Sequence, residues 1–194
     1  MTPQNSPSLP PHRSRRQWLA TGGVGLAAAA AGLWWRSRGP ASPPTPTVAT
    51  SSAEALGEDF WALQLERPDG TPVALSTWRG QPLVINFWAT WCPPCVREMP
   101  QLQQFHRQHQ PRGWTVLGLA VDGPTPVRHF LDRTPVDFPI LMAGLVGTDW
   151  VKRLGNPQAG LPYTVVATAS GAVVHRHQGD TTAQALAALV AALP

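Results

Sequence analysis

Cysteine is scarce in this sequence. The 194 residues include only two, and both lie in the run Trp91-Cys92-Pro93-Pro94-Cys95. No cysteine is left to link distant loops, which excludes a fold held together by structural disulfides. A tetrahedral zinc site needs four ligands, so the lack of a second cysteine pair also argues against structural zinc. Any thiol chemistry must therefore use Cys92 and Cys95.

Positive charge is missing from most of the chain, although the formal net charge is +4. Five of the 15 Lys and Arg residues precede residue 39, and the ten that follow are outnumbered by eleven Asp and Glu. A nucleic-acid surface needs clustered positive charge on the folded part of a protein. We therefore expect no nucleic acid as a partner and assign the basic residues to the N-terminal end.

One long uncharged run lies near the N-terminus. Residues 17–35 carry no formal charge over 19 positions, close to the roughly 20 residues that span a bilayer core. Trp18 and Trp34-Trp35 stand near its ends, as interfacial aromatic residues do. Ser14–Leu19 also resembles a twin-arginine export signal, and a plain positive-inside flank is the alternative. We predict that residues 1–38 are a signal or membrane anchor that delivers the rest of the chain to the periplasm.

A proline-rich linker is expected at residues 39–56. Residues 39–52 (GPASPPTPTVATSS) contain four prolines with Ser and Thr, and almost no large apolar side chain. Such a segment cannot bury a core and adopts an extended, polyproline-like conformation. The folded domain is expected to comprise residues 57–194.

Strands and helices alternate in the folded part. The runs Leu83–Trp88 and Thr115–Val121 are nearly continuous in apolar residues, which suits strands covered on both faces of a sheet. Further strands are expected at Phe138–Met142, Tyr163–Ala167 and Ala172–Arg176, a hairpin at Phe60–Glu66 and Thr71–Leu75, and helices at 93–109, 125–133, 147–154 and 181–193, the last opened by a capping box at 181–184. This order predicts an α/β fold with helices on both faces of the sheet and the cysteine motif at the carboxyl end of a central strand.

The two cysteines are predicted to exchange disulfides. Cys92 opens a helix, where the positive end of the helix dipole stabilises a thiolate. We expect its sulfur to be exposed and to attack, and Cys95, buried one turn further on, to resolve the mixed disulfide. Pro93 and Pro94 lack an N–H, so fewer backbone donors reach the Cys92 thiolate. Weaker stabilisation of the thiolate makes the dithiol a better electron donor, and we interpret the pair as a reductant.

Four other polar residues are candidates for a functional or a structural role. Glu98 lies three residues after Cys95 on the same helix face, where a partly buried carboxylate can exchange the Cys95 proton, or it faces solvent beside Arg97. His175 and His177 share a face of an expected strand and form either a metal pair or two surface histidines; surface histidines are the commoner case, and we predict no metal site. Asp122, at a strand end, is expected to cap or turn the chain.

The segment VINFWATWCPPCVREMPQL resembles the active-site strand and helix of the thioredoxin-like superfamily, most closely its exported TlpA, ResA and cytochrome c maturation branch. Weaker matches continue through 75–80, Val121-Asp122, Phe138-Pro139, 160–162 and 171–174, so that the resemblance covers about residues 57–194. The resemblance implies a thioredoxin-like fold with a central mixed sheet and an N-terminal β-hairpin. It also implies disulfide exchange with partner proteins in the periplasm.

Several site residues follow from the resemblance. It implies a functional glutamate at Glu98, while Asn86 stands where thioredoxin has a buried aspartate. It implies a cis peptide bond before Pro162, and Leu161 would then offer its backbone to an extended substrate segment. Trp91, Pro93 and Pro94 complete the expected substrate-binding surface, whereas Trp88 is expected to pack in the core.

The expected partners are proteins with disulfides, such as apocytochrome c or copper-site proteins, and a membrane electron donor of the thiol-reductant type. We expect no cofactor and a monomer. Two alternatives use the same residues: an oxidase that introduces disulfides, and a copper-binding module that combines the cysteine thiolates with a histidine. A peroxidase is a weaker alternative, because a Thr-X-X-Cys nucleophile loop is missing.

Overall fold

The structure, a computed structural model, describes residues 55–193. The predicted membrane segment, the twin-arginine-like motif and nearly all of the proline-rich linker lie outside this part. Between Ala55 and Leu193, no helix combines the length and the apolar character that a bilayer crossing requires.

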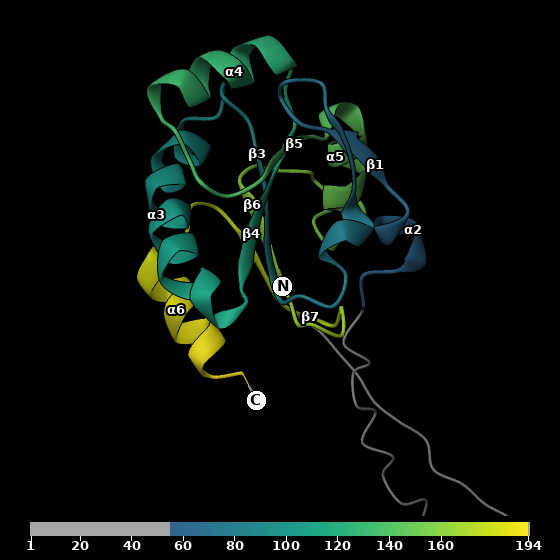
Figure 1. The fold of residues 1–194 in the computed structure, drawn as a ribbon, viewed down its shortest axis with the longest axis vertical. Coiled ribbons are helices and arrows are strands. Elements are labelled where there is room, and N and C mark those ends of the chain that lie inside the picture. The colour runs from purple at the N-terminus through teal and green to yellow at the C-terminus, as the bar shows by residue number, and fades with distance from the viewer. Residues whose placement is uncertain (1–54, 194) are drawn as a thin grey trace, which may run out of the picture. The chain divides into compact units, whose positions relative to one another are not determined.

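Residues 55–193 are built around a seven-stranded mixed sheet with the strand order β2-β1-β5-β4-β3-β6-β7 (Figure 1). The strands are β1 (Gln64–Glu66), β2 (Pro72–Ala74), β3 (Leu83–Trp88), β4 (Thr115–Ala120), β5 (Ile140–Met142), β6 (Tyr163–Ala167) and β7 (Val173–Gln178). β3, β4 and β5 are parallel, and the remaining pairs are antiparallel. Every residue of β3 is buried, so the strand that leads to the cysteines lies at the centre of the domain.

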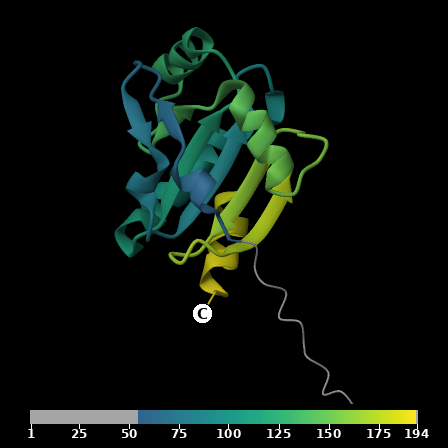
Figure 2. The same cartoon turned by 90° about the vertical axis from the view of Figure 1, so that its right-hand side faces the viewer.

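Helices cover both faces of this sheet (Figures 1 and 2). They are α2 (Glu58–Trp61), α3 (Pro93–His109), α4 (Pro124–Arg133), α5 (Gly144–Arg153) and α6 (Ala183–Ala191), with two short 3-10 turns at Leu75–Trp78 and Gln110–Arg112. Alternate residues of β3 enter two cores: Ile85 and Phe87 pack with Trp150 of α5, whereas Val84 and Trp88 pack with α3, α4 and α6. This alternation follows from the two-residue period of a strand. The α/β architecture with helices on both faces is thus as predicted.

The N-terminal part differs in detail from the prediction. The hairpin strand expected to begin at Phe60 begins at Gln64 and pairs antiparallel with Pro72–Ala74, because Glu58–Trp61 form a helical turn instead. Phe60 is fully buried and its ring meets Trp150 edge-on at 5.2 Å. Tertiary packing of two aromatic residues thus overrides the local preference of this short segment for a strand.

The predicted start of the last helix is also wrong by one residue. The predicted capping box placed the N-cap at Thr181, but Thr182 is the N-cap and its hydroxyl accepts a hydrogen bond from the Ala185 N–H at 3.1 Å. The Thr181 N–H instead reaches the side chain of Glu98 at 3.1 Å. The turn before α6 is therefore tied to α3 rather than only to its own helix.

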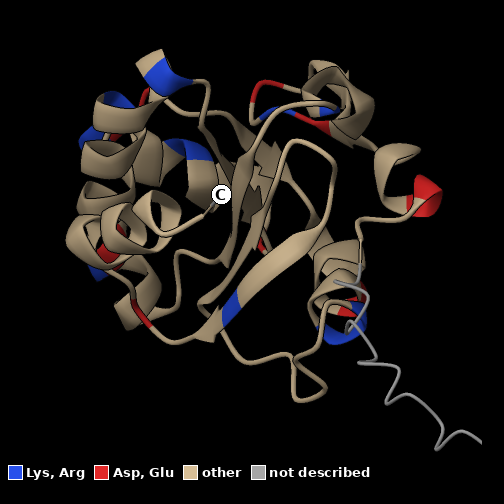
Figure 3. Cartoon of the chain, turned by 90° about the horizontal axis from the view of Figure 1, so that it is seen from below, with Lys and Arg blue, Asp and Glu red and all other residues tan. Residues whose placement is uncertain are grey.

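Charged residues are spread over the surface rather than collected in one area. Figure 3 shows acidic and basic segments interspersed on the helices and loops, with only one basic segment on the strand in front. Ion pairs join Arg97 to Asp180 at 3.3 Å and Arg107 to Asp137 at 2.6 Å. All four partners are more than half exposed, so these pairs orient segments more than they stabilise the fold.

Candidate active site

The cysteine pair lies where β3 passes into α3. Cys92 is the N-cap of α3, and its Sγ accepts a hydrogen bond from the Cys95 N–H at 3.4 Å. Pro93 and Pro94 occupy the first two helical positions, where proline is favoured because its φ is preset and the N–H would be unpaired. The two sulfurs form a disulfide, with Cα atoms 5.3 Å apart. The motif therefore holds the pair close enough to open and close without a large backbone movement.

The prediction that the Cys92 sulfur is exposed is wrong for this state. Cys92 is 5% accessible and Cys95 is 0% accessible, and both belong to the core on the α3 side of the sheet. Leu161 is partly buried and packs against the same core. Of the two cysteines only Cys92 retains contact with solvent, so Cys95 is the more deeply buried, as expected.

The residues around the disulfide separate into buried and exposed groups. Trp88 is fully buried and its ring lies 5.2 Å from that of Phe130, as the preference for core packing predicted. Trp91 is 66% exposed directly before Cys92. Pro93 is exposed and Pro94 is half-buried. Exposed apolar side chains thus lie directly beside Cys92, and aromatic side chains of this kind are enriched where proteins bind one another.

A second segment lies beside the cysteine loop from the neighbouring strand. β6 pairs antiparallel with β3, with Phe87 opposite Tyr163, so the start of β6 lies at the end of β3. The Leu161–Pro162 peptide bond is cis, as the resemblance implied. Within residues 55–193, the Leu161 main chain has no hydrogen-bond partner. Leu161 can therefore pair with an extended peptide by strand addition.

Glu98 is buried rather than solvent-facing, which resolves the two interpretations of its spacing. It is 1% accessible, and its two carboxylate oxygens accept hydrogen bonds from Asn86 Nδ2 at 2.8 Å and from the Thr181 N–H at 3.1 Å. Asn86 also donates to Thr164 Oγ1 at 3.0 Å. Burial raises the pKa of the Glu98 carboxyl from 4.5 to about 7, although the two donors favour the ionised form. A carboxyl with this pKa can both take and give a proton near neutral pH.

No motif in the sequence identifies Thr164 and Thr181 as members of this network. They lie 78 residues beyond Asn86 and 83 beyond Glu98. The only local signal is the apolar character of β6, which assigns Thr164 to a buried strand without naming its partner. Their contacts depend on the pairing of β6 with β3 and on the packing of α6 against α3.

Asp122 has the structural role expected for it. Its Oδ2 accepts hydrogen bonds from the Thr90 N–H at 2.9 Å and the Thr90 hydroxyl at 2.5 Å, and its Oδ1 accepts from the Gly123 N–H at 2.7 Å. These bonds join the loop after β3 to the loop after β4. Asp122 therefore fixes the segment that leads into Trp91 and Cys92.

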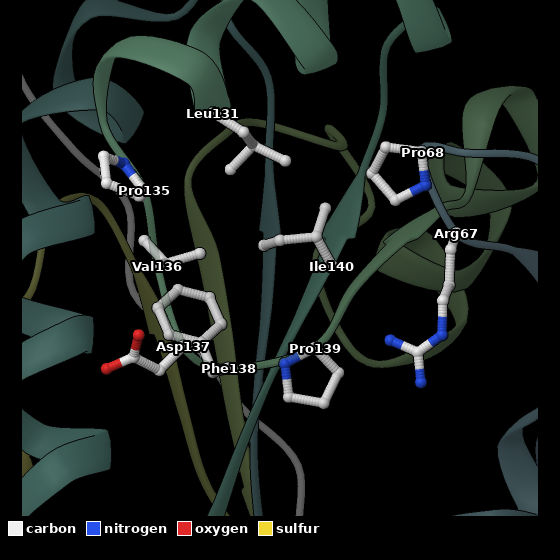
Figure 4. A pocket seen from close by; sticks show the side chains of 9 residues that line it. All are labelled: Arg67, Pro68, Leu131, Pro135, Val136, Asp137, Phe138, Pro139 and Ile140. Carbon is white, nitrogen blue, oxygen red and sulfur yellow. The ribbon is translucent and has the colours of Figure 1, made fainter.

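Two other features lie outside this site. His175 and His177 share one face of β7 with stacked rings 6.3 Å apart, and the described residues contain no cluster of three metal-ligating side chains. A hollow of about 350 Å³ lies between the β1–β2 turn and the segment before β5 (Figure 4), lined mainly by prolines and apolar side chains with Arg67 at its rim. Neither contains a residue of the cysteine loop.

The relatives of this chain agree with the site. The sequence profile of the Redoxin family matches residues 45–193. The thiol-disulfide oxidoreductase ResA of Halalkalibacterium halodurans is 30% identical over 137 residues, 70% of this chain and 76% of that protein. ResA of Oceanobacillus iheyensis is 36% identical over 84 residues, so the match spans 42% of this chain and less than half, 44%, of that protein.

A solved structure gives the same picture for the fold. A thiol:disulfide interchange protein of the thioredoxin family from Chlorobium tepidum TLS superposes with a TM-score of 0.60 at 26% identity, over 66% of this chain and 90% of that one. The family profile covers most of the chain, and the paired cysteines stand at the helix start where disulfide exchange takes place. The chain belongs to the Redoxin family and is a thiol-disulfide oxidoreductase with a thioredoxin-like fold.

Proposed function

We propose that this protein reduces disulfides of client proteins outside the cytoplasm, with Cys92 as the attacking thiol and Cys95 as the resolving thiol. The observation that carries the proposal is the Cys92–Cys95 disulfide at the start of α3, with Cys92 as the more accessible sulfur. Trp91 is exposed, and the Leu161 main chain has no hydrogen-bond partner among the described residues; both support a protein substrate over a small molecule.

The reaction transfers two electrons to the client. The Cys92 thiolate attacks one sulfur of the client disulfide, forms a Cys92–client bond and releases the first client thiolate. The Cys95 thiolate then attacks Cys92 Sγ, forms the Cys92–Cys95 disulfide and releases the second client thiolate. The two client thiolates take up protons, the client is reduced and the protein is oxidised.

Glu98 serves this reaction as the base for Cys95. It lies one helical turn beyond Cys95, and both side chains are buried. Cys95 must lose its proton before it can attack, and a carboxyl with a pKa of about 7 can accept that proton through a water molecule. The rate of resolution should therefore have an inflection near pH 7 that Glu98→Gln removes; an unchanged pH profile of the Cys95 thiol would contradict this role.

The direction of electron flow rests on the two prolines. Because Pro93 and Pro94 have no N–H, the first backbone donor of α3 that reaches Cys92 Sγ is that of Cys95, at 3.4 Å. One donor stabilises a thiolate less than several do. We expect a potential near the thioredoxin value of about −270 mV rather than the DsbA value of about −120 mV. A titration against glutathione measures it, and a value near −120 mV would assign the protein to disulfide formation instead.

The cellular setting belongs to the same proposal. Residues 17–35 would hold the domain at the membrane or direct its export through a twin-arginine-like signal, and a thiol-reducing membrane protein would return electrons to the monomeric enzyme. Apocytochrome c and copper-site proteins are candidate clients, because both need free cysteines outside the cytoplasm. Cys95→Ala should trap clients as mixed disulfides with Cys92, whereas Cys92→Ala should trap none; equal recovery from both variants would contradict the assigned roles.

A further inference from the structure

A groove runs along the side of the cysteine loop that faces away from β6. It has a volume of about 470 Å³ and is lined by Thr90, Val96, Pro126, His129, Phe130, Arg133 and Thr134. Thr90 precedes the cysteine loop by one residue and Val96 directly follows Cys95. One wall of the groove is therefore formed by the residues on either side of the cysteine loop.

The opposite wall is a single face of α4. Pro126, His129, Phe130 and Arg133 recur at intervals of three and four residues, so their side chains share one side of the helix. Phe130 is 5% accessible and packs on Trp88, which makes the floor apolar and fixed. His129 and Arg133 are exposed at the edge. The groove thus combines an apolar floor with an edge whose guanidinium group can only donate hydrogen bonds.

Arg133 has no ion-pair or hydrogen-bond partner within residues 55–193, whereas Arg97, on the α6 side of the loop, is paired with Asp180. Asp132, the preceding residue of α4, does not line this groove and lies with Arg128 and Leu131 at a different hollow. Asp122, which binds Thr90, already accepts hydrogen bonds with both carboxylate oxygens. The hollow in Figure 4 differs, because its carboxylate, Asp137, is bound to Arg107 and Gln103.

The order of the strands places this groove across the disulfide from Leu161. β6 and β4 pair with opposite sides of β3, so the segment before β6 and the helix after β4 flank the cysteine loop from two sides. For a client that is held at Leu161 with its disulfide at Cys92, the groove is the surface on the other side of the cysteine loop.

We infer that this groove binds a client segment that carries an acidic side chain next to its disulfide, with the carboxylate on Arg133 and an apolar neighbour over Phe130. The inference rests on the proposed reduction of client proteins and adds a preference among them. Arg133 acts as a specificity residue through charge, and the rate of exchange at the sulfurs is otherwise unchanged.

The test uses three cyclic disulfide peptides of otherwise identical sequence. The residues on both sides of the cysteines are Glu in the first peptide, Gln in the second and Lys in the third. The pre-reduced full-length protein is mixed with each peptide at low and high salt, and the rate of peptide reduction is measured. We expect the Glu peptide to be reduced about two- to fivefold faster than the Gln peptide and the Lys peptide more slowly, because an exposed ion pair contributes on this scale. Raising the salt to about 0.5 M should narrow these differences, since it screens exposed charges.

Two variants separate binding from folding. Arg133→Gln should bring the Glu peptide within about twofold of the Gln peptide and slow the Gln peptide less than the Glu peptide. Arg112→Gln removes the same charge at the far end of α3, after His109, and should preserve the preference. Equal rates for the Glu and Gln peptides with the unmodified protein, or an equal slowing of both by Arg133→Gln, would overturn the inference. Failure to reduce any of the three peptides would instead refute the proposed function.

Discussion

Replacing Glu98 by glutamine should stabilise the folded, oxidised protein above pH 7 and change its stability little at pH 4. Burial raises the pKa of the Glu98 carboxyl from 4.5 to about 7. In the unfolded chain the same carboxyl ionises near 4.5. Between these two pH values the folded state therefore holds a proton that the unfolded state has released.

The sign and the size follow from linkage. Because the folded pKa lies above the unfolded one, the stability of the unmodified protein falls as pH rises from about 4.5 to about 7, and the loss is complete above pH 7. The two pKa values differ by about 2.5, which corresponds to about 3 kcal/mol at 1.36 kcal/mol per pKa unit. Glu98→Gln removes this loss and should gain up to about 3 kcal/mol at pH 8.

The surrounding network can accept the amide. The oxygen of the introduced glutamine would receive the Thr181 N–H, and its NH₂ group would face Asn86. The Asn86 Oδ1 is buried without a hydrogen-bond partner among the described residues, so a rotation of that amide would turn an acceptor toward the new donor. The substitution therefore removes the charge and preserves the shape of the side chain, while Thr164, whose hydroxyl can also donate, would turn toward the rotated amide oxygen.

Urea unfolding at pH 4, 5.5, 7 and 8.5 measures the effect. The difference in unfolding free energy between the variant and the unmodified protein should grow through this range, and the contributions of other titrating groups cancel in that difference. Glu66→Gln, at an exposed position of β1, is the matched control and should give no such trend. A difference that is independent of pH, or a variant that is less stable at pH 8.5, would refute the buried and proton-holding state of Glu98.

Three further predictions concern single elements. Thr182→Ala should lower stability by about 1 kcal/mol in thermal or urea unfolding, because the Ala185 N–H loses its cap; an unchanged midpoint would show that the cap contributes nothing. Trp91→Ala should leave the unfolding midpoint nearly unchanged, since Trp91 is 66% exposed, but slow the reduction of protein disulfides, and equal rates would remove Trp91 from the client surface. Burial lowers the pKa of His106, so the folded protein should lose stability as pH falls below about 6.5, where the unfolded histidine takes up a proton. His106→Gln should reduce this loss when the unfolding free energy is compared at pH 7.5 and pH 5.5. An equal loss of stability in the variant and the unmodified protein would contradict the prediction.

The parts of the fold that the sequence predicts well are those with strong local signals. β3 and α3 have the expected bounds, because a continuous apolar run is followed by a cysteine N-cap and two prolines at the helix start. The short segment Glu58–Trp61 has no such signal, and its helical turn depends on packing against Trp150. Local patterns thus specify the centre of the domain better than its edge.

The candidate site shows the same division. The cysteines, the proline pair and the spacing of Glu98 can be read along one helix. The burial of Cys92 cannot, because it depends on a core that residues of β3, α3 and β6 form together, and Leu161 joins this core through the pairing of β6 with β3. The burial of Glu98 likewise requires Thr181, whose position depends on α6 packing against α3.

The identity of residue 86 explains how a buried carboxyl can remain on α3. Asn86 Nδ2 lies 2.8 Å from Glu98 Oε1, and an aspartate at that place would bring two carboxyl groups within hydrogen-bond distance in the core. Two such groups cannot both ionise, and one of them would keep its proton well above neutral pH. An amide donates to the Glu98 carboxylate without competing for the proton. In the proposed mechanism a single carboxyl group therefore exchanges its proton with Cys95, and β3 supplies the hydrogen-bond donor that favours the ionised form of this carboxyl.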